Sequence, residues 1–156
     1  MTRSRLDKID KNILKILQED GRVTNVDLAK SVGISAPPCL RRVRVLQESG
    51  YIKGYFAKVD PVKLGFGVNV YAMVTLKSQA ESDLVNFESY ITEFDMVREC
   101  HMLAGDVDFM LKVVAKSWDD YQEFLTAHLT SAPNVVSVKS SLSIRSSKSL
   151  PGIPIE

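Results

Sequence analysis

Residues 25–47 read NVDLAKSVGISAPPCLRRVRVLQ in a chain of 156 residues. Asn25 is a suitable N-cap for a short helix, and Gly33 suits the left-handed position that ends such a helix. Ser35 is a suitable N-cap for a second helix. Apolar residues recur at helical spacing on both sides of this turn, at Leu28, Ala29, Val32, Leu40, Val43 and Leu46. The stretch therefore predicts a helix-turn-helix.

The second predicted helix carries three arginines, Arg41, Arg42 and Arg44, that lie off its apolar stripe. A guanidinium group can grip a phosphate or the O6/N7 edge of guanine with two hydrogen bonds, so the pattern favours a helix that lies in the major groove of DNA. The alternative is an exposed arginine-rich helix with no partner. On the DNA interpretation, the predicted DNA-binding residues are Asn25, Ser35, Ala36, Pro38, Arg41, Arg42, Arg44 and Lys53.

The flanking sequence extends the motif to a three-helix domain with a wing. Apolar residues at three-and-four spacing predict an earlier helix over about residues 7–19. Residues 51–58, YIKGYFAK, predict a short β-ribbon after the second helix of the motif. Lys53 in this ribbon either touches the phosphate backbone or stays solvated.

Charge is unevenly distributed along the chain, although its net value is only +1. Residues 1–66 hold 13 Lys and Arg against 7 Asp and Glu, a net charge of +6, whereas residues 67–156 hold 7 against 12, a net charge of −5. This difference indicates that the first part meets a polyanion such as double-stranded DNA and the second does not. Chance segregation of surface charge is the alternative.

The composition is that of a globular protein, with 45% hydrophobic and 25% charged residues. No apolar run approaches the roughly 20 residues that span a bilayer, and the first residues lack the apolar core of a signal peptide. The two cysteines, Cys39 and Cys100, suggest no disulfide framework. We therefore expect a cytoplasmic protein, and on the DNA interpretation a nucleoid-associated one.

From Val68 onward the pattern changes to a mixture of strands and helices. Segments rich in β-formers predict strands, and segments with helical apolar spacing predict helices between them. The predicted order is strand 68–76, helix 83–91, strand 97–103, strand 108–115, a helix that Ser117 caps, and strand 135–144. This β-α-β-β-α-β order is the ferredoxin-like plan, a four-stranded antiparallel sheet with two helices on one face.

The chain is therefore predicted as an α+β protein with two domains. We expect a winged helix-turn-helix domain over residues 1–60, a linker over 61–67, a ferredoxin-like domain over 68–146 and a flexible tail over 147–156. Helices cover only one face of such a sheet, so the other face must meet water, a ligand or another subunit. Candidates for partial burial on the sheet are Tyr71, Met73, Met110 and Val138.

Three stretches are specific enough to compare with a known family. They are LDKIDKNILKILQEDGRVTNVDLAKSVGIS at residues 6–35, PPCLRRVRVLQESGYIKGYFAKVDP at 37–61 and ECHMLAGDVDFMLKV at 99–113. They resemble the Lrp/AsnC family, the feast/famine transcription regulators, and in particular its leucine-responsive branch. The third stretch is similar to the G-D-x-D turn of that family, and the resemblance covers nearly the whole chain.

The resemblance implies an oligomer that binds an amino acid such as leucine. Such proteins form dimers whose sheets pair face to face, and the dimers assemble into tetramers, octamers or larger discs that wrap DNA. The amino acid binds in the C-terminal domain, at the seam between dimers, near the G-D-x-D turn. The implied effector-binding residues are Met102, Leu103, Ala104, Gly105, Asp106 and Asp108, with Trp118, Ser141 and Ser143 from the same chain or from a neighbouring subunit.

The chemistry of the G-D-x-D turn suits a free amino acid. Gly105 allows a close approach of the backbone, and Asp106 or Asp108 would supply the negative charge that an ammonium group needs. The alternative is that Gly105 and Asp106 form only a hairpin turn, in which both residue types are favoured.

Two further functions compete with DNA binding. The residue types of Cys100 and His101 are those of a catalytic nucleophile and its base. Adjacent residues of a strand point to opposite faces, however, so these two cannot easily form a hydrogen-bonded catalytic pair. A metal site of His101, Asp106 and Asp108 has irregular spacing and no recognisable signature, so we expect no metal, no cofactor and no enzyme. The ferredoxin-like half would also suit a ligand-binding or assembly module without DNA recognition, against which the basic first half argues.

The sequence as a whole thus predicts a sequence-specific DNA-binding transcriptional regulator. Its oligomeric state and DNA occupancy would respond to a small effector, an amino acid according to the resemblance. The alternative within the same fold is an amino-acid-sensing or DNA-architectural protein with little sequence specificity.

Overall fold

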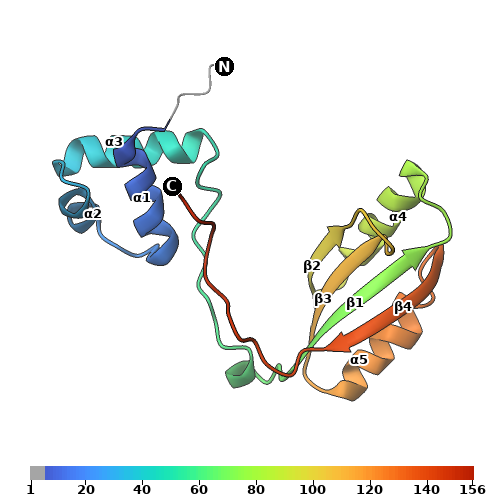
Figure 1. The fold of residues 1–156 in the computed structure, drawn as a ribbon. Helices are drawn as coiled ribbons and strands as arrows, with labels where there is room; N and C mark the ends of the chain where they lie inside the picture. The colour runs from blue at the N-terminus through green and yellow to red at the C-terminus, as the bar shows by residue number, and fades with distance from the viewer. Residues whose placement is uncertain (1–5) are drawn as a thin grey trace. The chain divides into compact units, whose positions relative to one another are not determined.

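The structure is a computed structural model that describes residues 6–156, and the chain divides into two compact units (Figure 1). The N-terminal unit comprises the chain up to Lys58 together with Lys148–Glu156, and the sheet unit comprises Val59–Ser147. The first five residues of the predicted DNA-binding domain lie outside the described residues. Residues 148–156, most of the segment expected as a flexible tail, group with the N-terminal unit.

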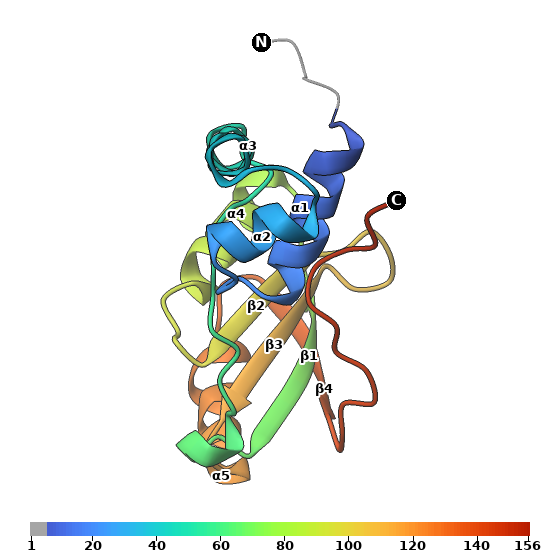
Figure 2. The ribbon, with the colours of Figure 1, turned by 90° about the vertical axis from the view of Figure 1, so that its left-hand side faces the viewer.

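The N-terminal unit contains three helices, α1 (Lys8–Glu19), α2 (Asn25–Ser31) and α3 (Ala36–Glu48), which Figure 2 shows from another side. The helices bury a common set of side chains, Ile13, Leu28, Ala29, Cys39 and Leu46. Complete burial of an aliphatic side chain of the size of leucine stabilises a fold by about 1.5–3 kcal/mol. This small core explains the spacing of the apolar residues, and the predicted three-helix arrangement is confirmed.

The ends of α2 differ in how well the sequence predicts them. Thr24 is the N-cap, because its Oγ1 accepts a hydrogen bond from the Asp27 amide at 3.1 Å, and Asn25 is already the first helical residue. The prediction of Asn25 as N-cap is therefore wrong. The side-chain amide of Asn25 donates instead to the Ala36 carbonyl at 2.8 Å. Gly33 has a φ of 74°, which confirms the left-handed turn between α2 and α3.

The predicted β-ribbon over residues 51–58 is wrong, since none of these residues is in a strand. The amides of Tyr51 and Ile52 both donate to the Leu46 carbonyl, at 2.9 and 3.2 Å, and so belong to the C-terminal end of α3. The following residues run without regular structure as far as a short 3₁₀ helix at Val62–Leu64.

The sheet unit has the predicted β-α-β-β-α-β order, and its bounds lie within two residues of the predicted ones. Its elements are β1 (Val68–Leu76), α4 (Glu81–Ile91), β2 (Val97–Met102), β3 (Phe109–Ala115), α5 (Trp118–Phe124), which continues as a π-helical turn over Leu125–Leu129, and β4 (Val135–Leu142). The strands are antiparallel in the order β2-β3-β1-β4, and Figure 1 shows α4 and α5 on one face. The ferredoxin-like prediction is confirmed.

The helix-covered face of the sheet forms the core of this unit. Alternate residues of β1 and β3 are buried against α4 and α5, namely Val70, Ala72, Val74, Leu76, Phe109, Leu111, Val113 and Ala115 with Phe87, Ile91, Tyr121 and Phe124. The opposite, open face carries Tyr71, Met73 and Met110, which are half-buried as expected. Val138 is also half-buried, but it pairs with the buried Val74 and so lies on the helix-covered face.

The start of α5 and the lengths of the helices complete the description of the fold. Ser117 caps α5 as predicted, since its Oγ accepts from the Asp120 amide at 3.1 Å and the Asp120 carboxylate accepts from the Ser117 amide. Among residues 6–156, no helix combines the length and the apolar character that crossing a membrane requires.

Candidate nucleic-acid interface and ligand site

The three arginines of α3 differ in their surroundings. Arg41 and Arg44 are exposed, and within residues 6–156 neither guanidinium forms an ion pair. Arg42 is half-buried, and its Nη1 donates to Asp7 Oδ2 at 2.7 Å and to Asp10 Oδ1 at 2.8 Å. Arg41 and Arg44 are therefore available to an external polyanion, whereas Arg42 is engaged inside the unit.

The carboxylates that hold Arg42 also form the N-terminal cap of α1. Asp7 Oδ1 accepts from the Asp10 amide at 2.8 Å, and Asp10 Oδ2 accepts from the Asp7 amide at 3.2 Å. The hydrogen bond from the Asp10 amide, followed by the contact with Arg42, lowers the pKa of Asp7. The hydrogen bonds to Asp10 and Asp7 raise the pKa of Arg42. Asp7 and Arg42 thus stay charged at neutral pH, and the cluster fastens α3 to the start of α1.

The first turn of α3 presents small and rigid residues. Ser35 is exposed at the N-cap position, and Ala36 and Pro38 are half-buried. Ser35 has extended backbone angles, but among the described contacts its side chain makes no capping hydrogen bond. Its hydroxyl therefore remains available to a partner, although the prediction of Ser35 as the N-cap residue is confirmed.

The other two predicted DNA-binding residues lie off α3. The side chain of Asn25 links the start of α2 to the start of α3, and within the described chain its buried Oδ1 has no hydrogen-bond partner. Lys53 is exposed and follows α3 in the segment without regular structure. The structure therefore brings Ser35, Ala36, Pro38 and Arg41 together on one helix and leaves Lys53 outside it.

The turn between β2 and β3 is fastened through Asp108. The Asp108 carboxylate accepts from the Leu76 amide at 2.7 Å and from Gln79 Nε2 at 3.4 Å, and the Asp108 amide donates to the Val74 carbonyl at 3.0 Å. The Leu103 amide closes the turn by donating to the Asp108 carbonyl at 2.8 Å. Asp108 thus has a structural task at the end of β1, which sequence reasoning missed.

The rest of this turn is open to solvent. Ala104, Gly105 and Asp106 are exposed, and Met102 and Leu103 expose 59% and 38% of their surface. Among the atoms of residues 6–156, none within 4 Å would obstruct a side chain at Gly105. The turn therefore offers a free carboxylate at Asp106 beside exposed apolar side chains, a combination that suits the ammonium and side chain of an amino acid.

Ser143, one of the predicted effector-binding residues, lies far from this turn. The Ser143 amide donates to the Asn69 carbonyl at 2.8 Å, near the start of β1, whereas Asp108 is bonded to Val74 near its end. The five residue steps from Asn69 to Val74 correspond to roughly 17 Å of strand.

Ser141 and Trp118 lie toward the same end of the sheet as Ser143. Ser141 pairs with Tyr71, and Trp118 follows Ala115, which pairs with Val68. A single chain does not bring these three residues together with the G-D-x-D turn. A shared pocket therefore requires a second subunit, which was one of the two options that the sequence left open.

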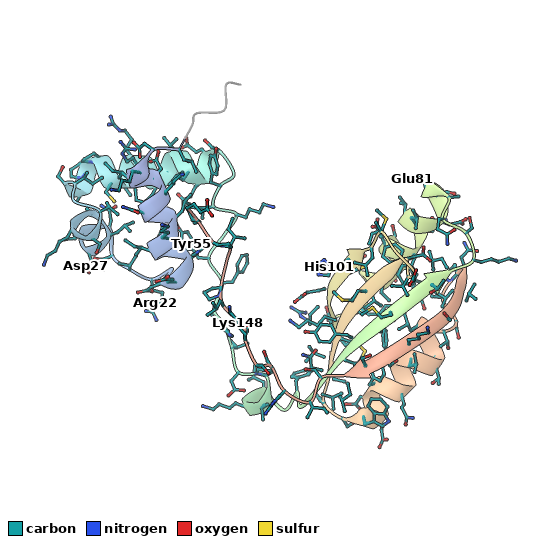
Figure 3. All side chains as sticks on the ribbon, viewed as in Figure 1. Arg22, Asp27, Tyr55, Glu81, His101 and Lys148 are labelled. Atoms are coloured by element: carbon teal, nitrogen blue, oxygen red, sulfur yellow. The ribbon has the colours of Figure 1, made fainter. Side chains whose placement is uncertain are left out.

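Cys100 and His101 do not form a catalytic pair in this chain. Cys100 pairs with the buried Leu111 on the helix-covered side, whereas His101 pairs with Met110 and contacts Glu99 Oε2 at 3.3 Å on the open face (Figure 3). Burial raises the pKa of the Cys100 thiol to about 11, so the thiol is protonated at neutral pH. Among residues 6–156, no group of three His, Cys, Asp or Glu side chains is arranged to hold a metal ion.

Sequence reasoning missed the carboxylates that hold Arg42. Asp7 and Asp10 stand three residues apart at a predicted helix start, the spacing of a reciprocal N-terminal cap. That signal was present in the sequence, but nothing local linked it to an arginine more than thirty residues later.

Both units match known protein families. Residues 6–53 match the family described as winged helix-turn-helix DNA-binding, and residues 69–153 match the family described as the Lrp/AsnC ligand binding domain. A leucine-responsive regulatory protein of Rhizobium meliloti (strain 1021) is 45% identical over 148 residues, 95% of each chain. The Bkd operon transcriptional regulator of Pseudomonas aeruginosa is 44% identical over 141 residues, 90% of this chain and 92% of its own.

Solved structures agree with these sequence matches. A transcriptional regulator of Neisseria meningitidis, crystallised as a complex with L-Met, superposes with a TM-score of 0.91 at 30% identity, over 96% of this chain and 97% of its own. An AsnC family transcriptional regulator of Agrobacterium tumefaciens superposes with a TM-score of 0.89 at 34% identity over the same shares. With its helix-turn-helix, its ferredoxin-like sheet and these matches along almost its full length, the chain belongs to the Lrp/AsnC family of DNA-binding transcriptional regulators.

Proposed function

We propose that α3 is the recognition helix of a sequence-specific regulator whose assembly and DNA occupancy respond to an amino acid. The observation that carries the DNA part is the pair Arg41 and Arg44, both exposed and without an ion-pair partner in residues 6–156. An unpaired guanidinium loses no internal contact when it binds a phosphate or a base edge, so its full interaction energy is available to DNA.

The proposed contacts divide by position along the motif. Ser35, Ala36, Pro38 and Arg41 face the base edges of the major groove, and Arg44 and Lys53 lie toward the phosphate backbone. Asn25, predicted among the DNA-binding residues, has its side-chain amide engaged by the Ala36 carbonyl, so we assign it the task of positioning the start of α3. Arg42 was predicted among the residues nearest DNA, but its Nη1 is occupied by Asp7 and Asp10. We therefore assign it the task of holding α3 in position.

The effector is proposed to be an aliphatic amino acid that binds near the turn at Gly105. The leucine-responsive relative and the neighbour crystallised with L-Met support this class. The exposed carboxylate of Asp106 would receive the ammonium group, beside the apolar side chains of Met102 and Leu103. The remaining proposed effector-binding residues are Ala104, Asp108 and, from a neighbouring subunit, Trp118, Ser141 and Ser143.

The proposed assembly is a homo-oligomer built from dimers. The half-buried side chains of Tyr71, Met73 and Met110 on the open sheet face support it, because apolar groups on a face without helices gain by pairing with a second copy. As a DNA-binding regulator, the protein is proposed to act in the cytoplasm, in association with the nucleoid.

The DNA proposal is tested by selecting bound duplexes from a random library and measuring the affinity of selected and scrambled duplexes at several salt concentrations. Sequence-specific recognition predicts a preference of 10³-fold or more for selected duplexes and a log–log salt slope of about −0.9 per phosphate contact. Equal affinity for all duplexes would support the architectural alternative, which the net charge of +6 on residues 1–66 favours. An affinity independent of salt would contradict DNA binding through α3.

The effector proposal is tested by a thermal-shift screen with the twenty amino acids, read beside native mass under the same conditions. An amino acid that binds one assembly state more tightly raises the melting temperature and shifts the mass distribution together. If none of the twenty changes either quantity, the effector proposal is wrong, while the DNA proposal is unaffected.

A further inference from the structure

The last residues of the chain pack on the first helix of the DNA-binding unit. Gln18 on α1 donates from Nε2 to the Ile153 carbonyl at 2.9 Å, and its Oε1 accepts from the Ile153 amide at 3.2 Å. The carboxamide of Gln18 therefore pairs with both polar groups of one backbone residue, as a neighbouring strand would. Figures 1 and 2 both show the C-terminal end of the chain beside α1.

Gly152 fits this contact for two separate reasons. Its φ of 68° lies in the left-handed region, which side chains disfavour. A Cβ atom at this position would also overlap the carboxamide of Gln18. Any other residue at position 152 therefore strains the backbone and displaces the group that holds Ile153.

A groove of about 720 Å³ lies beside these hydrogen bonds, and its lining includes Leu14, Leu17 and Ile52 together with Pro154 and Ile155. Ile155 is half-buried there. At the beginning of the segment, Lys58 Nζ donates to Ser149 Oγ at 3.5 Å. The segment 148–156 is thus held at both ends within the N-terminal unit.

This packing gives the two units a second connection, in which the segment is covalently continuous with the sheet unit and is held on the N-terminal unit by hydrogen bonds. The chain passes from the N-terminal unit into the sheet unit after Lys58 and returns to it at Lys148. Both connections leave the sheet from neighbouring strands, because Ser143, which follows β4, donates its amide to Asn69 near the start of β1. A displacement of the sheet where Ser143 is bonded to Asn69 therefore acts on the DNA-binding unit through two chain segments, the one that follows Lys58 and the one that begins at Lys148.

We propose that residues 148–156 are a strap through which the state of the effector-binding domain reaches the recognition unit. The proposal rests on the proposed function, because it assigns a route to the amino-acid control described there. Ser141 and Ser143, two of the proposed effector-binding residues, lie only a few residues before the strap. An effector that shifts Ser141 and Ser143 relative to β1 would displace residues 148–156, which Gln18 holds at Ile153.

The docking of the strap is tested by hydrogen exchange of the full chain in three forms besides the wild type. Gly152→Ala strains and displaces the strap, and Gln18→Ala removes both hydrogen bonds while keeping a residue of high helix propensity in α1. Gly65→Ala is the matched control, since Gly65 has a φ of 84° but a Cβ atom there would meet no atom of the described residues within 4 Å. We expect exchange about tenfold faster in α1 and residues 51–55 of the first two variants, with β1 unchanged in all three.

The control of DNA binding is tested with the same variants, by DNA affinity with and without L-leucine or L-methionine. The strap variants are expected to bind DNA within threefold of the wild type but to lose the change that the amino acid causes. Equal α1 exchange in the wild type and Gly152→Ala would overturn the docking, and a full amino-acid response in a variant with fast α1 exchange would overturn the control. If the wild type responds to no amino acid, the effector proposal and the control by the strap both fail, and the exchange data still decide the docking.

Discussion

Arg42 on α3 donates from Nη1 to Asp7 Oδ2 at 2.7 Å and thereby joins the proposed recognition helix to the N-cap of α1. The same nitrogen reaches Asp10 at 2.8 Å, so both carboxylates of the cap also serve the ion pair. Hydrogen bonds between charged groups are shorter and stronger than those between neutral groups, so these contacts link α3 to the start of α1 directly. The orientation of α3 against α1 therefore depends on a charged residue as well as on the small apolar core.

The first prediction concerns this ion-paired cluster. Arg42→Ala removes both ion pairs, and we expect the free energy of unfolding of the protein to fall by more than in Arg44→Ala, since only Arg42 loses internal partners. DNA affinity should fall by a similar factor for every sequence, because Arg42 positions α3 and reads no base. Denaturant unfolding and fluorescence anisotropy measure the two effects.

Arg44→Ala is the matched control for Arg42, since Arg44 is exposed and unpaired within the described residues. Its unfolding free energy should stay within about 0.5 kcal/mol of the wild type. A double-mutant cycle with Asp10→Ala should show that Arg42 and Asp10 are coupled. Independent, additive effects of the two changes would show that the ion pair contributes nothing to stability.

The second prediction separates base reading from phosphate contact. Arg41→Ala should weaken binding to the selected duplex by about 1–3 kcal/mol and relax the preference at one base pair, whereas Arg44→Ala should weaken all duplexes alike and reduce the salt slope by about one contact. Anisotropy titrations with selected, singly substituted and scrambled duplexes measure this difference, with the exposed Lys77→Ala in the sheet unit as control. A uniform loss for Arg41→Ala would reassign Arg41 to the phosphate backbone.

The elements of the fold were predictable because their causes are local. Val70, Ala72 and Val74 alternate along β1 and point to one buried face, so a period of two residues is visible in the sequence. Ser117 and Asp120 stand three residues apart at the start of α5, where each carries one half of a cap. Such signals extend over a few residues and need no knowledge of the tertiary fold.

The features that the sequence did not reveal depend on partners far along the chain. Gln18 and Ile153 are 135 residues apart, and no local pattern marks either as half of a contact. Arg42 lies off the apolar stripe, as an exposed residue would, but its partner Asp7 stands 35 residues earlier. The helical pattern identified the face of α3 that is polar, but not which of its arginines is already paired.

The third prediction concerns the pH dependence of the sheet unit. The hydrogen bond from Lys112 Nζ at 2.7 Å, followed by the contact with His101, lowers the pKa of Glu99 below its ordinary value of 4.5. Ionised Glu99 therefore stabilises the folded state above about pH 4.5, and this contribution is lost as the pH falls through the lower, folded pKa. The pair is partly exposed, so the loss should be about 0.5 kcal/mol.

Unfolding of Glu99→Gln measured between pH 3 and pH 7 tests this assignment. The variant should be less stable than the wild type at pH 7 and equally stable at pH 3, because protonation removes the same charge. A constant difference over this whole range would show that the lost stability comes from packing and not from the charge of Glu99.

The fourth prediction concerns the reactivity of the cysteines. Burial raises the pKa of Cys100 to about 11 and raises that of the fully buried Cys39. Since the thiolate is the reactive form, neither thiol should react measurably with a disulfide reagent at pH 7.5 in the native protein, and both should react at once in denaturant. Rapid native labelling of Cys100, absent in Cys100→Ser, would contradict the burial of this thiol and make Cys100 a candidate nucleophile again.

The last prediction distinguishes the two carboxylates of the G-D-x-D turn. Asp108→Ala deprives the Leu76 amide of its acceptor, and an unsatisfied buried amide costs about 1–3 kcal/mol, so this variant should melt at a lower temperature without any ligand. Asp108→Asn keeps an acceptor oxygen and should melt close to the wild type. Asp106 is exposed, so Asp106→Asn should leave the melting temperature unchanged while removing the shift that the amino acid produces. If Asp106→Asn keeps that shift and the stable Asp108→Asn loses it, the negative charge that receives the ammonium group belongs to Asp108.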